Sequence, residues 1–279
     1  MEERLHFPEP DALRLQPRLP PRPPQDAPSS RLSAVGRPFV TLTFATSLDS
    51  SLALAPGTRT ALSGPQSKAM THFLRTRHDA ICVGVGTAIA DDPGLNSRLE
   101  AATIENQPRP VVIDPHDRWS FSESSKVLRL ARDGAGLAPF IITGVQQPPA
   151  SKRQLLEAHG GKYIIIRPTP SHDGDPIDPR PTRFHWRDIL QSVAAEGLRS
   201  IMIEGGGDII NSILDAPNRD LVDSVIVTIA PTWLGQGGVV VSPPRAVNAA
   251  GQPIAAARLS NVLWHPLGED VVLCGNLEK

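Results

Sequence analysis

Short apolar runs alternate with amphipathic segments along most of the chain. Runs in which β-branched and apolar residues follow one another are typical of strands that are buried on both faces. The run from Phe39 to Ala45 is the first of these. The segments that we expect to contain strands are 39–45, 78–87, 109–115, 138–144, 162–168, 199–207 and 221–232.

Amphipathic segments lie between these runs and predict helices. Ser63 followed by Gln66 forms a capping box and Pro65 suits a first helical turn, so we expect a helix from there to about His78. Further helices are expected over 151–161, over 186–197 and after the glycines to about Leu214. Residues 87–98 are expected to form a turn, and 258–279 two short strands around a turn.

Alternation of buried strands with helices predicts an α/β fold. The central sheet should be mostly parallel with helices on both faces, and the closing strands should add antiparallel edges. We expect one domain over residues 37–279, with a loose surface insertion at 168–185.

The first 36 residues contain eight prolines and show little periodicity. Such a segment buries too little apolar surface to fold alone, so we expect a disordered tail over residues 1–36. A proline-motif ligand for a partner protein is the alternative.

Composition excludes several classes of protein. The 279 residues are 40% hydrophobic and 20% charged with a formal net charge of −1, so no broad field favours nucleic acid or an acidic membrane. Any phosphate recognition must be local. Cys82 and Cys274 lie far apart in apolar runs, which suits buried thiols better than a disulfide. No apolar run is long enough to span a bilayer and no secretory signal is visible, so we expect a cytoplasmic protein.

The stretch IMIEGGGDII, residues 201–210, places three glycines where a strand feeds a helix. It is not a standard dinucleotide fingerprint, because Ile210 replaces the last glycine and Asp223 comes near the start of the next strand. Glycines at such a corner still expose backbone N–H groups at a positive helix end, which favours an anion. A tight turn without a ligand is the alternative.

A second glycine corner follows the strand that ends at Gly84 and Gly86. Thr87 and Asp91 come directly after it. Parallel strands bring such loops together at their carboxyl ends, so the two corners could cradle a dinucleotide. The alternative is that Thr87 caps a helix and Asp92 forms a turn before Pro93.

The order of five motifs resembles that of the riboflavin-biosynthesis reductases, and of their stand-alone fungal members in particular. The motifs are TLTFATSLDSSLAL, SGPQSKAMTHFLRTRHDAICVGVGTAIADDPGLNSR, RPVVIDP, IMIEGGGDIINSIL and VTIAPTWLGQGG. The likeness covers residues 37–277 without 168–185. It implies a dihydrofolate-reductase-like fold, NADPH as hydride donor and a homodimer. The implied reaction opens a phosphorylated ribosylaminopyrimidine to an imine and reduces its C1′.

The resemblance also implies which residues bind the cofactor. Thr87 and Asp91 match cofactor contacts of the first corner. The backbone of Gly206, Gly207, Asp208 and Ile209 matches the seat of the NADPH phosphates, with Gly205 supporting the turn. The resemblance does not indicate which residue binds the 2′-phosphate of NADPH. Arg167 is our candidate for this role.

Substrate contacts follow from the same resemblance. Glu204 matches the substrate-side acid, although a charge satisfied at the helix end is an alternative. Arg75 and Arg98 match positions near the substrate and could bind its 5′-phosphate, although solvated surface arginines would look the same. Leu95 would line the pyrimidine pocket.

Asp49 matches the acid of an S-L-D-G signature in which Ser50 here replaces the glycine. It would hydrogen-bond the substrate or relay a proton, so that Asp49 and Glu204 are the expected catalytic residues. A turn aspartate is the alternative.

Three other functions are alternatives. A deaminase–reductase fusion requires a zinc site of H-x-E and P-C-x-x-C type, for which the chain lacks paired cysteines, so we expect no metal. Dihydrofolate or pteridine reduction would use the same fold. A non-catalytic nucleotide-binding module would have lost the chemistry altogether.

Overall fold

The computed structural model describes residues 3–21, 36–167, 184–248, 250–254 and 256–278. Most of the predicted 168–185 insertion lies outside these residues. Within them, Phe184 is buried and His185 precedes a helix.

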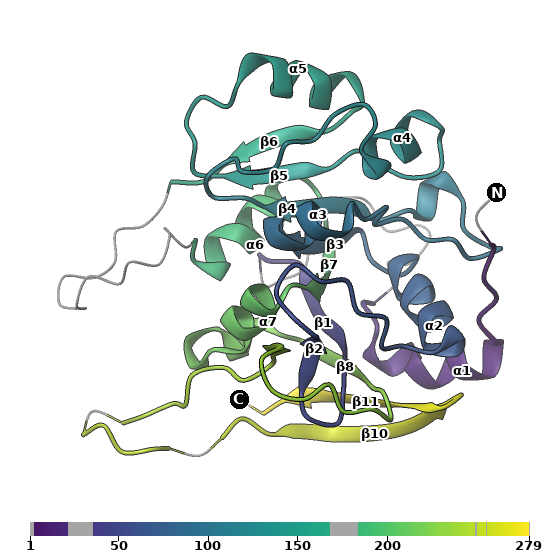
Figure 1. Ribbon diagram of the computed structural model, residues 1–279, viewed down its shortest axis with the longest axis vertical. Coiled ribbons are helices and arrows are strands. Elements are labelled where there is room, and N and C mark those ends of the chain that lie inside the picture. Colours follow the sequence, from purple (N-terminus) through teal and green to yellow (C-terminus); the bar gives the residue numbers. More distant parts are fainter. Residues whose placement is uncertain (1–2, 22–35, 168–183, 249, 255, 279) are drawn as a thin grey trace.

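One nine-stranded sheet forms the centre of the protein (Figure 1). Across the sheet the strands are β10 (Leu259–Leu267), β11 (Asp270–Leu277), β8 (Ser224–Ile229), β1 (Phe39–Thr46), β7 (Ser200–Gly205), β3 (Ala80–Gly84), β4 (Arg109–Ile113), β5 (Phe140–Thr143) and β6 (Lys162–Ile165). The strands from β8 to β6 run parallel to one another, whereas β11 is antiparallel to both β8 and β10. The predicted mostly parallel sheet is therefore confirmed, with its antiparallel strands at one edge.

Helices cover both faces of this sheet, as alternation along β7 shows. Ile201 and Ile203 pack into a core with α6 (Trp186–Ala195) and α7 (Gly207–Leu214). Met202 points the other way, towards α2 (Pro65–Arg75). That second face also carries α3 (Val85–Asp91), α4 (Lys126–Arg132) and α5 (Ala150–Ala158).

A two-stranded ribbon of β2 (Ser51–Ala53) and β9 (Val239–Val240) lies outside the main sheet. It covers the start of α7, because a Cβ on Gly207 would lie 2.4 Å from the Cγ1 atom of Val239. Three short 3-10 segments complete the elements: η1 (Gln16–Arg18), η2 (Ile104–Asn106) and η3 (Ala216–Leu221).

The expectation of a disordered tail over residues 1–36 is wrong for residues 3–21. This segment forms α1 (Glu9–Leu15) and η1 and packs against α2 and the β10–β11 hairpin. It folds because Leu5, Phe7, Leu15 and Leu19 are buried in a core that the rest of the chain supplies. Residues 22–35 lie outside the described part of the chain.

Helix boundaries differ from the expectations at two places. Gly64, not Ser63, precedes α2, and its N–H donates to the carboxylate of Asp270 at 2.9 Å, so the predicted capping box is absent. The expectation of a turn over 87–98 is wrong for residues 87–91. These residues belong to α3, which starts directly at the end of β3. No helix in the described residues is long and apolar enough to cross a membrane.

Candidate functional site

A cavity of about 200 Å³ opens at the carboxyl ends of β8, β1 and β7. Its lining is mostly polar and comes from these three strands, from α2 and from the residues just before α2. The lining residues are Thr43, Phe44, Ala45, Ser63, Thr71, Arg75, Glu204 and Thr228. A second cavity of about 220 Å³, which shares Phe44, is lined by apolar residues and Arg219 and offers no acid.

Glu204 and Arg75 form a two-pronged ion pair in the first cavity. Nε and Nη2 of Arg75 donate to the two carboxylate oxygens at 3.0 and 2.6 Å, and each side chain is only 15% exposed. Nη1 of Arg75 donates to the carbonyl of Asn96 at 2.9 Å. Arg75 thus orients the acid, and its donors do not form the open phosphate fork that the sequence led us to expect.

His72 lies beside this pair on α2, and nothing in the sequence singled it out. Its Nδ1 accepts the backbone N–H of Arg98 at 3.0 Å, and Nη2 of Arg98 lies 3.2 Å from Nε2. Burial lowers the pKa of His72 to about 2, helped by the positive charges of Arg75, Arg98 and Lys68. The ring is therefore neutral at physiological pH and is no proton donor.

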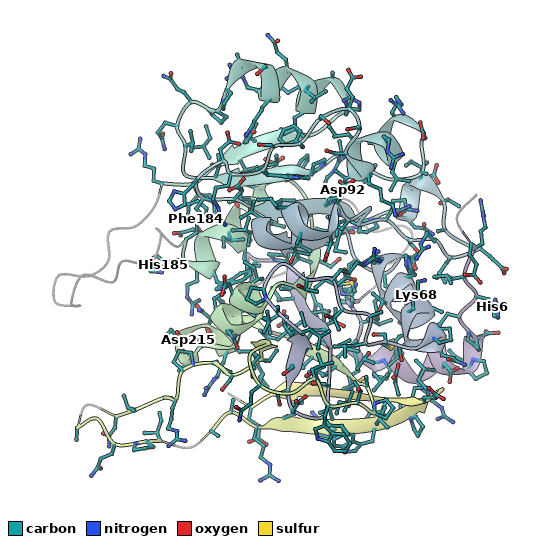
Figure 2. All side chains as sticks on the ribbon, viewed as in Figure 1. His6, Lys68, Asp92, Phe184, His185 and Asp215 are labelled. Carbon is teal, nitrogen blue, oxygen red and sulfur yellow. The ribbon has the colours of Figure 1, made fainter. Side chains whose placement is uncertain are left out.

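Two of these cations, Lys68 and Arg75, lie on one face of α2. Residues 68, 71, 72 and 75 fall within about 100° of one another at 3.6 residues per turn, and Figure 2 labels Lys68 on α2. Among the described residues, Glu204 is the acid paired with this face. Lys68 adds a positive charge to this face, and the i, i+3, i+4, i+7 spacing of the four residues is the signal in the sequence that could have identified it.

The two glycine corners meet. Gly206 has a φ of +82°, and a Cβ there would lie 3.0 Å from the Oγ1 atom of Thr87. Cβ atoms on Gly205 or Gly86 would project into open space. No side chain caps α7, so the N–H groups of its first turn remain available for a ligand.

The remaining glycines of the corners serve packing. A Cβ on Gly84 would lie 2.7 Å from Cγ1 of Ile209, so this glycine lets α7 approach β3. Gly207 does the same for Val239. Ile209 therefore fills space with its side chain, while Asp208 is exposed.

The residues at the end of α3 and just after it differ in their burial and contacts. Asp91 ends the helix and is half-buried. Asp92, labelled in Figure 2, adopts a φ of 37° and accepts the N–H of Lys126 at 3.0 Å. Leu95 is buried among apolar side chains and is not among the residues that line the cavity.

Asp49 connects the turn after β1 to the loop after β8 through hydrogen bonds to its carboxylate. Its carboxylate accepts hydrogen bonds from the Ser47 hydroxyl and from the N–H groups of Leu234 and Gly235, the latter two at 3.2 and 2.7 Å. The bonds from Ser47 and then Leu234 lower the pKa of Asp49. Ser50 has a φ of 61°, so it takes up the left-handed conformation that the signature glycine would adopt. These contacts match a turn aspartate; a role towards substrate stays a prediction.

No group of three or more histidine, cysteine, aspartate or glutamate side chains suited to a metal ion occurs in the described residues. Both cysteines are buried and free, and burial raises the pKa of Cys82 to about 12.

Residues 38–273 match the family model of the RibD C-terminal domain. The 2,5-diamino-6-ribosylamino-4(3H)-pyrimidinone 5′-phosphate reductase of Candida glabrata is 38% identical, over 88% of this chain and 91% of that protein. The reductase of the same name from Saccharomyces cerevisiae is 38% identical, over 86% and 87%. A solved structure of the Saccharomyces riboflavin biosynthesis reductase covers 97% of this chain and 100% of its own, with 32% identity and a TM-score of 0.72. Acinetobacter baumannii RibD shares the fold, with a TM-score of 0.65.

Proposed function

Because this chain belongs to the RibD C-terminal domain family, we propose that it reduces 2,5-diamino-6-ribosylamino-4(3H)-pyrimidinone 5′-phosphate to the ribitylamino product in riboflavin biosynthesis, with NADPH as hydride donor. Fungal relatives that match most of the chain carry this activity in their names. The protein is thus an oxidoreductase.

One observation carries the cofactor proposal: the Thr87 hydroxyl faces Gly206 at an uncapped helix start, next to the cavity that holds Glu204. The residues fit a dinucleotide, because a positive φ and open space at the glycines let a pyrophosphate approach the backbone. When bound, NADPH supplies the hydride. Thr87, Gly206 and the N–H groups of Asp208 and Ile209 would hold its phosphates, with Asp91 near the ribose.

The order of strands supports an assignment of residues to the two ends of the cofactor. The cavity lies at β8, β1 and β7, whereas the glycine corners lie at β7 and β3. With the nicotinamide at the cavity, the residues at the end of β4 would lie on the adenosine side of the cofactor.

The loop after β4 carries two basic side chains that are candidates for binding the 2′-phosphate of NADPH. Asp114 fixes the loop by accepting the N–H groups of Arg118 and Trp119 at 3.0 and 2.8 Å. The side chains of His116 and Arg118 are exposed, and no ion pair or hydrogen bond to either side chain occurs among the described residues. Arg167 follows β6, two strands further on. We therefore assign the 2′-phosphate to Arg118 ahead of Arg167.

Glu204 is our candidate for the negative charge that stabilises the cationic form of the substrate during reduction. Opening of the ribosylamine ring gives an imine, which is a better hydride acceptor when its nitrogen is protonated, and a nearby carboxylate stabilises that cation. The pairing with Arg75 keeps the carboxylate aimed at the cavity. Glu204→Gln should then lower kcat by at least about tenfold at unchanged NADPH affinity; an unchanged kcat would remove Glu204 from the chemistry.

A homodimer is proposed at the free edge of the sheet. β10 has no strand partner on its outer side in the described residues, and Val262 and Trp264 on it are 44% and 59% exposed. Exposed apolar edge strands readily pair with a second chain.

Oxidation of NADPH in the presence of the ribosylaminopyrimidine phosphate tests the function. We expect turnover with this substrate and none above background with dihydrofolate. Turnover of dihydrofolate alone would reassign the chain to a pteridine-type reductase, and failure to bind NADPH would leave a non-catalytic module.

A further inference from the structure

Residues 3–21, here called the N-terminal strap, are bound to the body of the protein along their whole length. Apolar side chains of Leu5, Phe7 and Leu15 are buried in the core below α2. Polar contacts continue from there to the hairpin, where Arg18 donates to the Asn276 side chain at 2.8 Å and Asp11 lies 3.0 Å from Nε2 of His265.

The strap is hydrogen-bonded to the segment that carries Arg98. Leu5 forms a parallel bridge with Leu99: its N–H donates to the carbonyl of Arg98 at 2.9 Å, and its carbonyl accepts the N–H of Glu100 at 3.0 Å. The N–H of Arg98 itself donates to His72 at 3.0 Å. The backbone of Arg98 is therefore bonded on one side to α2 and on the other to the strap.

The strap also supports α2 from behind. The ring of Phe7 stacks on that of Phe73 with centroids 5.1 Å apart, and the side chain of Gln16 accepts a hydrogen bond from Arg77 at 2.7 Å. Phe73 lies on the side of α2 opposite the face that holds Lys68 and Arg75, since about 100° separates successive residues, and Arg77 follows two residues after the helix ends. Both α2, which brings Arg75 to the cavity, and the segment of Arg98, for which the sequence predicts a contact with the 5′-phosphate, thus rest on the strap.

We propose that the N-terminal strap is a positioning element for substrate binding, and that Leu5, by fixing the backbone of Arg98, sets the affinity for the 5′-phosphate end of the substrate. The inference rests on the proposed function. Leu5 acts through Arg98 and does not touch the substrate. Holding a charged group in one place matters because its contribution to binding depends on pre-organisation.

The strap leaves the cofactor corners alone. α7 packs on the opposite face of the sheet, in a different core (Figure 1). α3 lies on the same face as α2, but it packs in a core separate from that of the strap. No hydrogen bond joins residues 3–21 to α3 or α7 in the part of the chain that the structure describes. A change in the strap should therefore separate the affinity for substrate from the affinity for NADPH.

The test uses three variants of the full chain. Leu5→Pro removes the N–H that donates to Arg98, Phe7→Ala removes the ring contact with α2, and Leu13→Ala is the matched control, since Leu13 on α1 is 64% exposed. For each we would measure KM and kcat for the ribosylaminopyrimidine phosphate, Kd for NADPH, and Kd for ribose 5-phosphate as a non-reacting probe by calorimetry.

We expect Leu5→Pro to raise the KM for substrate and the Kd for ribose 5-phosphate by roughly three- to tenfold, the worth of one hydrogen bond, with kcat and the Kd for NADPH within about twofold of wild type. Phe7→Ala should act in the same direction and Leu13→Ala should have no effect. Equal changes for substrate and NADPH, or a lower Tm at unchanged substrate KM, would overturn the proposal, because the strap would then serve stability alone. A wild-type chain without reductase activity would refute the proposed function, whereas the ribose 5-phosphate titration would still decide the role of the strap.

Discussion

Gly206 is the residue on which the cofactor site depends most directly. Its φ is +82°, and any Cβ at this position would lie 3.0 Å from the Thr87 hydroxyl, so the corner has room for glycine alone. Gly206→Val should weaken NADPH binding by at least about tenfold, because the side chain would separate the two corners. A fluorescence titration with NADPH measures this.

The control is Gly160→Val at the amino end of β6. Gly160 also has a positive φ, +80°, with open space around its Cβ position, so Gly160→Val introduces backbone strain away from the two corners. Equal NADPH affinity in the two variants would show that the loss arises from strain and not from the corner.

Arg118 provides the second test at this scale. If its guanidinium binds the 2′-phosphate, Arg118→Ala should raise the Kd for NADPH by roughly ten- to a hundredfold, as loss of a charge-assisted contact implies, and leave the Kd for NADH unchanged. Arg167→Ala should change neither. The reverse pattern, with NADPH affinity lost only in the Arg167 variant, would assign the 2′-phosphate to Arg167.

Among the elements, α2 connects the sheet to the cavity, and His78 is its anchor. Nε2 of this buried ring lies 2.7 Å from the Thr41 hydroxyl on β1, and Nδ1 lies 2.7 Å from the carbonyl of Leu74. Burial lowers the pKa of His78 from 6.5 to about 4. Because the folded pKa lies below the unfolded one, the stability is complete above pH 6.5 and is lost as the pH falls towards 4.

Urea unfolding at pH 8 and pH 5 tests this anchor. At pH 5 protonation of the unfolded chain at this site costs about 2 kcal/mol of stability relative to pH 8, so the difference in unfolding free energy between wild type and His78→Gln should shrink by that amount. His6→Gln, on an exposed side chain, is the control. A difference that does not vary with pH would contradict the assignment.

Elements with a strong local pattern could be predicted from the sequence. Runs such as Phe39–Ala45 become parallel strands because their β-branched and apolar side chains can be buried on both faces of the sheet. For the segment after Gly84 the prediction was wrong. Its aspartates and proline suggest a turn, whereas α3 occupies the first part of the segment. α4 is short and was missed.

The strap could not be predicted, because its signal is not local. Four apolar residues scattered among prolines show no period, and they fold only against α2 and Leu99. The meeting of the glycine corners followed from the rule that parallel strands bring their carboxyl ends together. In contrast, nothing in the sequence showed that Arg75 pairs with Glu204, since that contact joins residues 129 positions apart.

For the molecule as a whole, the free β10 edge predicts a homodimer. Trp264→Lys places a charge on an exposed apolar position of the edge, and such a charge blocks pairing between sheets. Analytical ultracentrifugation should find a dimer for wild type and a monomer for this variant, with Ile104→Lys, on η2, still dimeric. A wild-type monomer, or a dimeric Trp264 variant, would place the interface elsewhere or exclude it.

The central claim is that two backbone corners hold a reduced dinucleotide against the cavity of Glu204 so that its hydride reaches C1′ of the substrate. The most direct measurement uses NADPH carrying deuterium at C4, on one face and then on the other, with mass analysis of the product. We predict that one of the two labels transfers a single deuterium to C1′ of the ribityl chain. A ribityl product without deuterium from either label would contradict this claim.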